Sequence, residues 1–357
     1  MSHSVDPIKK LEHADALSPT PYVDPRFYQH DLNHIIAANW QCIAPASSAS
    51  DVGDVISRDI AGVPIMVVRG RDQSLNGFYN ICLHRAGPVA DCDKKGLSRL
   101  RCAYHGWSYD LDGQLIFAPE MKEAESFNTN DKRLKRIEVV EWGNMIFARL
   151  DGHNGPTFDE LYGTIETKLP LGSLNNLRHH SSQLYSVNCN WKVYIDNFLE
   201  GYHLPFVHPG LSQAVSYSDY HTELAQWWSL QQTPIEEETQ AYGTGHGYYF
   251  YVYPNVMLNI MPGRMQSNRV VPTGIDSCEI EFEFYYTPEA QERAVEDQVF
   301  SEQIQEEDRI ICEHVQKGLT SGVYSPGRLS PKRESGVWHF QNLLRREYRL
   351  AGFTEYR

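Results

Sequence analysis

Two short segments decide the fold: Cys82-Leu83-His84-Arg85-Ala86-Gly87-Pro88 and Cys102-Ala103-Tyr104-His105-Gly106-Trp107. Each contains one cysteine, one histidine and a glycine, and residues 85–101 separate the two Cys/His pairs. Glycine permits a close approach of the backbone, so both segments predict tight loops around a bound group. Thiolate and imidazole are both good ligands for metals. The four side chains therefore predict one shared metal site.

The mixed ligands favour a Rieske-type [2Fe-2S] cluster. Ordinary iron–sulfur clusters use four thiolates, whereas a Rieske centre replaces two of them by histidines on one iron. Cys82 and Cys102 would then bind one iron, and His84 and His105 the other. A structural zinc site is the alternative, although zinc fingers usually pair Cys with Cys and His with His. The remaining cysteines lack such partners and are expected to be buried small apolar residues: Cys42, Cys92, Cys189, Cys278 and Cys312.

A second dense stretch runs Asn190-Trp191-Lys192-Val193-Tyr194-Ile195-Asp196-Asn197-Phe198-Leu199-Glu200-Gly201-Tyr202-His203-Leu204-Pro205-Phe206-Val207-His208. A helix up to Leu204 would place Asp196, Glu200 and His203 on one face. Pro205 disfavours helix at Leu204, so the chain is expected to turn there and bring His208 towards His203. Two histidines and one carboxylate with open positions suit a non-haem Fe(II) that binds O2, so a carboxylate from elsewhere is needed.

The best candidate for that carboxylate lies in the acidic segment 300–315. Phe300, Ile304, Ile311 and Val315 form an apolar row at helical spacing, and Asp308 falls within it. A carboxylate that faces a core is costly unless it is paired or binds metal. Asp308 is therefore the predicted ligand, and Glu307, which borders the same face, is the alternative.

The length of 357 residues predicts two domains, because single cores seldom exceed about 300 residues. The formal charge of −14 argues against nucleic acid and anionic membranes as partners. Without an apolar span or signal-like segment, a cytoplasmic protein is expected. The predicted parts are a lead-in (1–40, helical over 31–40), a small all-β domain (41–150) and an α+β domain (151–357) with helices at 190–204 and 296–318 and strands at 247–260 and 278–287.

Together these motifs resemble the α subunits of Rieske ring-hydroxylating oxygenases, from about Trp40 to Arg346. Within that superfamily the sequence is most similar to the quaternary-ammonium group of choline, glycine betaine and carnitine monooxygenases. The resemblance rests on Cys102–Gly113, Asn190–His208 and the acidic helix that holds Asp308. It implies an α+β fold: a small all-β Rieske domain and a helix-grip (START-like) catalytic domain with an antiparallel sheet.

The same resemblance implies the roles of several residues. His203, His208 and Asp308 correspond to the iron ligands, and the acidic residue three before the first histidine bridges the two metal centres. That residue is aspartate in most of the superfamily and Glu200 here, as in carnitine-type enzymes. Asn197 is a further catalytic candidate. Family members also form head-to-tail homotrimers and need a separate flavin and iron–sulfur reductase that uses NADH or NADPH; the absence of a Gly-rich nucleotide loop agrees with this.

Aromatic residues are the main indication of the substrate in the sequence. Strand-like alternation could place Tyr249, Tyr251 and Tyr253 along one pocket wall, with Trp227 and Trp228 completing a cage for a cation. The alternative is an aromatic sheet face packed under a helix. Three functions remain open: an oxygenase acting on a quaternary ammonium or N-methyl compound, an oxygenase acting on an aromatic ring or acid whose carboxylate meets Arg264, and a non-catalytic electron-transfer or zinc-binding protein.

Overall fold

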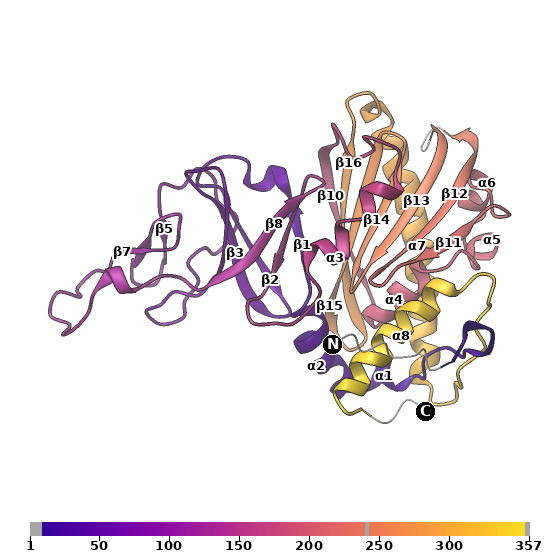
Figure 1. Ribbon diagram of the computed structural model, residues 1–357, viewed down its shortest axis with the longest axis horizontal. Coiled ribbons are helices and arrows are strands. Elements are labelled where there is room, and N and C mark those ends of the chain that lie inside the picture. The colour runs from indigo at the N-terminus through magenta and orange to yellow at the C-terminus, as the bar shows by residue number, and fades with distance from the viewer. Residues whose placement is uncertain (1–8, 240–242, 354–357) are drawn as a thin grey trace. The chain divides into compact units, whose positions relative to one another are not determined.

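The computed structural model describes residues 9–239 and 243–353, and the chain divides into two compact units (Figure 1). One unit is the continuous segment Ile36–Gly155, and the other combines Met1–Ile35 with Pro156–Arg357. Among the described residues, no helix has both the length and the apolar character needed to cross a membrane.

The unit Ile36–Gly155 is all β, as the sequence predicted. Its main sheet has six antiparallel strands in the order β1-β9-β8-β4-β3-β2, and a smaller sheet has the order β5-β6-β7. The strands are β1 (Gln41–Pro45), β2 (Val55–Ile60), β3 (Val63–Arg69), β4 (Leu75–Tyr79), β5 (Leu100–Arg101), β6 (Ser108–Tyr109), β7 (Leu115–Phe117), β8 (Arg136–Trp142) and β9 (Met145–Arg149). Two apolar clusters form its core. One of them includes Cys82, Cys102 and Trp107.

The other unit is built on a seven-stranded antiparallel sheet with the order β10-β16-β15-β14-β13-β12-β11. Its strands are β10 (Arg178–Val187), β11 (His221–Leu224), β12 (Trp228–Thr239), β13 (Gly243–Val252), β14 (Val256–Met261), β15 (Arg264–Gly274) and β16 (Ser277–Tyr286). The predicted single strand 247–260 is thus two strands, β13 and β14, joined by a turn at residues 253–255.

Helices cover one face of this sheet, which gives the α+β, helix-grip arrangement expected from the sequence (Figure 1). The helices of the unit are α1 (Thr20–Val23), α2 (Pro25–His30), α3 (Phe158–Tyr162), α4 (Trp191–Phe198), α5 (Leu204–Val207), α6 (Pro209–Ala214), α7 (Ala294–Thr320) and α8 (Ser335–Leu350). Helix α4 contacts α7 and β15, and α8 places Phe340 against Tyr251 of β13 with ring centroids 5.5 Å apart. The long α7 contains the whole predicted segment 296–318.

Two predicted helices end earlier than expected. The helix expected over 190–204 ends at Phe198, so Asp196, Glu200 and His203 do not share one helical face. Asp196 instead accepts hydrogen bonds from Tyr22 Oη at 2.5 Å and Gln341 Nε2 at 3.1 Å. The helix expected over 31–40 is a π-helical segment, Asp31–Ile36, that follows α2 directly.

A buried ion pair joins the N-terminal segment to the rest of its unit. Asp31 and Lys192 are fully buried and ion-paired. Asp31 also accepts hydrogen bonds from Trp191 Nε1 at 3.0 Å and from Tyr348 Oη at 2.8 Å. A buried charge without partners would be strongly destabilising, so these contacts hold the N-terminal segment against both α4 and α8.

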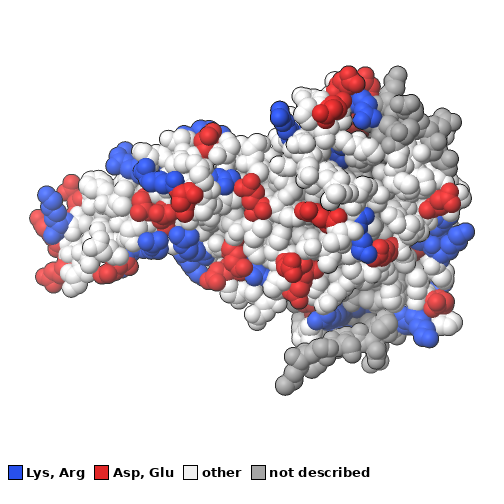
Figure 2. All heavy atoms as spheres, turned by 45° about the horizontal axis from the view of Figure 1, so that its top comes forward, with Lys and Arg blue, Asp and Glu red and all other residues white. Residues whose placement is uncertain are grey.

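Charges on the surface are mixed in sign. Figure 2 shows acidic and basic side chains interspersed on the visible face, with no wide basic area. Among the cysteines, Cys42, Cys189, Cys278 and Cys312 are buried as predicted. The prediction for Cys92 is wrong, because this residue is exposed: it lies in the loop between β4 and β5, where the acidic and basic neighbours Asp91, Asp93 and Lys94 favour solvent.

Candidate metal centres and substrate pocket

The two Cys/His loops of the β unit have the same backbone hydrogen bonds. In the first loop the N–H of Cys82 donates to the carbonyl of Gly87 at 2.8 Å, and in the second the N–H of Cys102 donates to the carbonyl of Trp107 at 3.0 Å. Ala86 and Gly106, each four residues after its cysteine, adopt positive φ angles of 57° and 74°. The repeated backbone pattern presents one cysteine and one histidine from each loop.

The side chains of the two loops approach each other, histidine with histidine and cysteine with cysteine. His84 and His105 turn their Nδ1 atoms to within 3.1 Å of each other. Cys82 and Cys102 are buried, whereas both histidines are only half-buried. Tyr109 Oη lies 3.2 Å from Cys82 Sγ, close enough to hydrogen bond a cluster ligand. Two buried thiols and two half-buried imidazoles are the donor set that would hold a Rieske [2Fe-2S] group.

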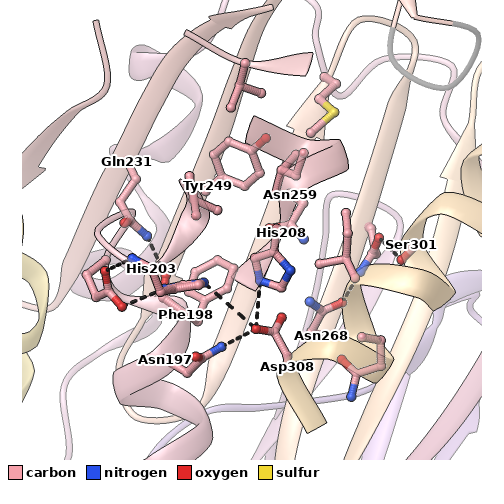
Figure 3. A pocket seen from close by; sticks show the side chains of 18 of the residues that line it. Asn197, Phe198, His203, His208, Gln231, Tyr249, Asn259, Asn268, Ser301 and Asp308 are labelled. Carbon is pink, nitrogen blue, oxygen red and sulfur yellow. Dashed lines mark hydrogen bonds and ion pairs between the residues drawn. The ribbon is translucent and has the colours of Figure 1, made fainter. Parts of the chain in front are cut away.

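The second site lies in the α+β unit between α7 and the segment that follows α4 (Figure 3). His203, His208 and Asp308 each offer one ligand atom, and these atoms lie within 4.8 Å of one another. Asp308 Oδ1 is 3.0 Å from His208 Nε2 and 3.9 Å from His203 Nε2.

The local sequence explains why the chain breaks between α4 and His203. The Glu200 carboxylate accepts hydrogen bonds from the backbone N–H groups of Tyr202 and, at 3.1 Å, His203, which caps the turn. A Cβ at Gly201 would lie 2.8 Å from the ring of Tyr220, so only glycine fits there without movement. Pro205 then lies in the first turn of α5, where proline is well tolerated, rather than at the break itself.

Each histidine of this site has a carboxylate on its other ring nitrogen. His203 Nδ1 lies 2.6 Å from Glu200 Oε1, and His208 Nδ1 lies 2.7 Å from Glu307 Oε2. A carboxylate beside Nδ1 favours a proton on that nitrogen, and Nε2, on the Asp308 side of each ring, is then the atom that can bind a metal. This carboxylate–histidine pairing is typical of protein metal sites, where it fixes the tautomer and the ring orientation. The donor set fits a mononuclear Fe(II).

Asp308 and Glu307 have different partners, although they are neighbours on α7. The side chain of Asn197 donates to Asp308 Oδ1 at 2.5 Å. The carboxylates also affect His208: burial alone would lower its pKa, but Asp308 and then Glu307 outweigh that effect and raise the pKa. Asp308 thus faces the Nε2 atoms of both histidines, whereas Glu307 lies beside Nδ1 of His208.

A small pocket of about 100 Å³ adjoins the triad. Five aromatic side chains line it, together with Asn197, Glu200 and the triad: Tyr194, Phe198, Tyr220, Tyr249 and Phe282. A second cavity of about 470 Å³ meets Glu200 and His203 from another side and is lined mainly by apolar residues of α7 and α8 and by the N-terminal segment. Glu200 and His203 therefore lie between two spaces.

Comparison with known proteins agrees with both sites. Residues 39–128 match the Rieske [2Fe-2S] domain, and residues 174–349 match the catalytic domain of ring-hydroxylating α subunits. The chain belongs to the Rieske non-haem iron oxygenases. It is 29% identical to the chloroplastic choline monooxygenase of Arabidopsis thaliana over 97% of this chain and 86% of the relative. It is also 29% identical to the carnitine monooxygenase oxygenase subunit of Escherichia coli (strain K12), over 90% and 91%.

Solved structures resemble this oxygenase over nearly its full length. A quaternary ammonium Rieske monooxygenase in complex with L-carnitine has a TM-score of 0.84 and 26% identity, covering 95% of this chain and 97% of that one. Naphthalene 1,2-dioxygenase from Rhodococcus, at 18% identity and a TM-score of 0.75, shares the fold. The protein is thus an O2-using oxidoreductase with a Rieske cluster and a mononuclear iron.

Of the aromatic residues singled out in the oxygenase sequence, only Tyr249 lines the small pocket. Trp228 pairs in register with Val252, on the opposite face of the sheet from Tyr249, because successive strand residues alternate. Tyr251 follows Tyr249 on its own face but lies under α8 against Phe340. Tyr253 lies in the turn after β13 and packs at a tilted angle against Trp227, with 5.5 Å between ring centroids. Four of the five candidates are thus structural aromatics in this arrangement.

Sequence reasoning missed several residues of the oxygenase pocket. Phe198 and Tyr220 line it, as do the polar side chains of Gln231, Asn259, Gln266 and Gln305. The sequence did offer a reason to include Phe198, because this residue lies in the segment Asn190–His208 that contains the two candidate iron histidines. The polar residues come from four separate elements, so no local pattern could link them. Arg264 also lines the pocket, ion-paired with the buried Asp297.

Proposed function

We propose that this chain is the terminal oxygenase of a multicomponent system that hydroxylates a quaternary ammonium or N-methyl compound, with demethylation or C–N cleavage as the outcome. The arrangement of His203 and His208, each with a carboxylate on Nδ1 and with Nε2 towards Asp308, is the observation that carries the oxygenase assignment. Likeness to choline and carnitine monooxygenases over at least 90% of the chain supports the substrate class.

The pocket chemistry also supports a cationic substrate. Phe198, Tyr220 and Tyr249 line the space beside the triad, and aromatic rings of this kind can stabilise a cation. The aromatic-acid alternative needs a cation for the carboxylate, but Arg264 is already ion-paired with Asp297. These observations favour the ammonium substrate over an aromatic acid.

The residues of the triad and those around it have separate tasks. Bound at these two sites, the cluster delivers electrons and the mononuclear iron activates O2. His203, His208 and Asp308 would hold the iron, and the adjoining pocket would receive the substrate. Asn197 orients Asp308 through its hydrogen bond, and Glu200 sets the tautomer of His203. Leu204, Leu211 and Ile304 line the pocket with apolar groups that limit water around the reacting carbon.

We further propose that Glu200 links the two metal centres across a subunit interface in a homotrimer. Glu200 and His203 border the larger cavity as well as the small pocket. On the β unit, half-exposed His84 and His105 lie beside the exposed apolar residues Leu83 and Tyr104. A surface of this kind suits docking against another subunit. A solved relative has been described with inter-subunit electron transfer in carnitine oxidation, which supports the proposal.

The electron source is proposed to be a separate flavin and iron–sulfur reductase that uses NADH or NADPH, in the cytoplasm. Turnover with such a reductase is the direct test. Choline, glycine betaine, carnitine and an aromatic acid are supplied in turn, and formaldehyde and hydroxylated products are measured. Oxidation of an ammonium compound is expected, whereas oxidation of the aromatic acid alone would overturn the proposed substrate. Iron and acid-labile sulfide analysis of the same samples distinguishes an iron–sulfur protein from a zinc protein, and iron with sulfide is the expected result.

A further inference from the structure

The sheet floor of the small pocket carries a row of polar side chains in cross-strand register. Gln231 of β12 pairs with Tyr249 of β13, Tyr249 with Asn259 of β14, and Asn259 with Gln266 of β15. Residues that pair directly lie on the same face of a sheet. A sheet face covered by helices is normally apolar, so a continuous polar row in this position calls for a physical reason.

The two ends of the row are satisfied within the protein. Gln231 accepts a hydrogen bond from Tyr220 Oη at 2.8 Å and donates to the carbonyl of Phe198 at 2.7 Å. Gln266 accepts from Ser301 Oγ at 3.1 Å. The ends therefore fasten the sheet to the segments and helices above it.

The centre of the row has no such partners. Among the described residues, Tyr249 Oη and Asn259 Oδ1 are buried and make no hydrogen bond, and the same holds for Gln305 Nε2 on α7. All three side chains line the small pocket. In Figure 3, Tyr249 and Asn259 lie beyond His208, on the side away from Asp308. An unsatisfied buried polar atom costs about 1–3 kcal/mol, so three around one pocket indicate a bound polar group.

Gly247 allows Tyr249 to take its position. A Cβ at Gly247 would lie 3.0 Å from Tyr249 Oη, so the phenol ring lies over a residue that has no side chain. Burial raises the pKa of Tyr249, and its hydroxyl therefore keeps its proton and can donate. Tyr249 and Gln305 thus provide donors, while the amide of Asn259 can both donate and accept.

The charges around the pocket limit which polar group can bind. Arg264 is ion-paired with Asp297, which is fully buried and also accepts a hydrogen bond from Tyr286 Oη at 2.6 Å. A carboxylate entering this end of the pocket would compete with Asp297 for Arg264, and its desolvation would be costly. A hydroxyl or carbonyl oxygen matches the neutral donors and acceptor without adding charge.

We propose that Tyr249, Asn259 and Gln305 form a hydrogen-bonding subsite for an uncharged oxygen group of the substrate, a hydroxyl or a carbonyl. The inference rests on the proposed function and refines it: the ammonium end lies towards the iron, and the oxygen group selects the substrate. Tyr249 then acts as a hydrogen-bond donor rather than as part of an aromatic cage alone.

Binding under anaerobic conditions tests the subsite without turnover. Isothermal titration of the iron-loaded enzyme compares choline, propyltrimethylammonium, in which a methyl replaces the hydroxyl, and glycine betaine, which carries a carboxylate. The wild type should bind choline about tenfold more tightly than propyltrimethylammonium, since one hydrogen bond contributes about 1.4 kcal/mol. Tyr249→Phe and Asn259→Leu should each reduce that preference severalfold, with KM rising and kcat changing little.

Tyr253→Phe is the matched control, because the Tyr253 hydroxyl is also buried, has no hydrogen-bond partner within residues 9–239 and 243–353, and lies outside the pocket. This variant should keep the wild-type preference. Gly247→Ala should displace the Tyr249 ring and weaken choline binding while leaving both metals in place. If Tyr249→Phe and Asn259→Leu keep the wild-type preference, or if glycine betaine binds most tightly, the subsite is overturned while the oxygenase function stands. Failure of the wild type to bind or oxidise any ammonium compound overturns both proposals.

Discussion

His208 Nδ1 lies 2.7 Å from Glu307 Oε2, while its Nε2 lies 3.0 Å from Asp308 Oδ1. Two adjacent carboxylates on α7 thus act on opposite nitrogens of one ring. One is placed to bind metal beside the imidazole, and the other sets which nitrogen carries the proton. Asp308 and Glu307 thus have distinct positions, whereas the sequence alone offered them as alternatives for the same ligand.

Replacement of Glu307 should weaken iron binding without affecting the cluster. Removal of such an outer partner typically costs 10–100-fold in metal affinity, so we expect about tenfold for Glu307→Gln and up to about a hundredfold for Glu307→Ala. Competition with a chelator measures the iron affinity, and the visible absorption of the cluster serves as the internal reference. Glu306→Gln is the control, since Glu306 is exposed and paired with Arg309. Equal affinity in all variants would remove the positioning role of Glu307.

Glu200→Gln should keep both metals yet lose most turnover. Glu200 uses Oε2 for the backbone N–H groups of the turn and Oε1 for His203 Nδ1, whereas a Gln amide has a single acceptor oxygen. That oxygen can still cap the turn while the NH2 group faces His203, and the three candidate iron ligands are unchanged, so the iron site is expected to form with reduced affinity. The negative charge proposed to link the metal centres is lost. Stopped-flow spectroscopy should show that the reduced cluster is reoxidised much more slowly with O2 and substrate present. Wild-type reoxidation in this variant would contradict the linking role. Glu200→Ala tests the turn as well, because it also removes the hydrogen bonds.

Cys102→Ser should lose the cluster while the mononuclear iron remains. Cys102 belongs to the compact unit Ile36–Gly155, and the triad belongs to the other unit. Loss of the red colour, with iron still bound and sulfide absent, is the expected analysis. A variant that keeps the Rieske spectrum would refute the assignment of Cys102 as a ligand.

Stability should respond to pH through Asp196. Burial raises the pKa of Asp196 from 3.8 to about 7. Between these values the folded protein binds more protons than the unfolded chain, so this residue makes stability fall as pH rises and its penalty is complete above about pH 7. Relative to the wild type, the free energy of unfolding of Asp196→Asn should rise by at most about 1.4 kcal/mol per pH unit from pH 4 to 7. Denaturant unfolding at several pH values measures this.

The control for that experiment is a carboxylate whose pKa is shifted in the opposite direction. Hydrogen bonds from Ser74 lower the pKa of the exposed Asp72, so its carboxylate adds stability above the unfolded pKa and loses it as pH falls. Asp72→Asn should therefore lose a little stability relative to the wild type at neutral pH. Parallel pH curves for Asp196→Asn and the wild type would show that Asp196 is not held in its neutral form by burial.

The sequence predicted the α+β fold and both clusters of metal-binding side chains because their signals are local. Cys82 and His84, or His203 and His208, lie within a few residues of each other and need only one loop to meet. Asp308 does lie beside His203 and His208, although the reason for choosing it was partly mistaken. The buried row of α7 contains Asp297, Ser301, Gln305 and Cys312, and Asp308 continues its spacing, whereas Val315 of the proposed apolar row is exposed.

Other features depended on contacts that the sequence does not reveal. Helix α4 ends early because the Glu200 carboxylate caps the turn and because Tyr220, nineteen positions after Gly201, fills the space of a missing side chain. Trp228 lies outside the pocket because strand register places it on the other face. Gln231, Tyr249 and Asn259 become neighbours only through pairing between strands.

The unit Ile36–Gly155 is continuous in sequence, whereas its companion takes residues from both sides of it. During synthesis on the ribosome, the cluster-binding part therefore emerges complete while the iron-binding part still lacks most of its chain. The hydrogen bond from Tyr348 to Asp31 can form only after nearly the whole chain has been synthesised. Maturation should accordingly proceed in two stages, with cluster insertion possible well before the pocket that uses its electrons exists.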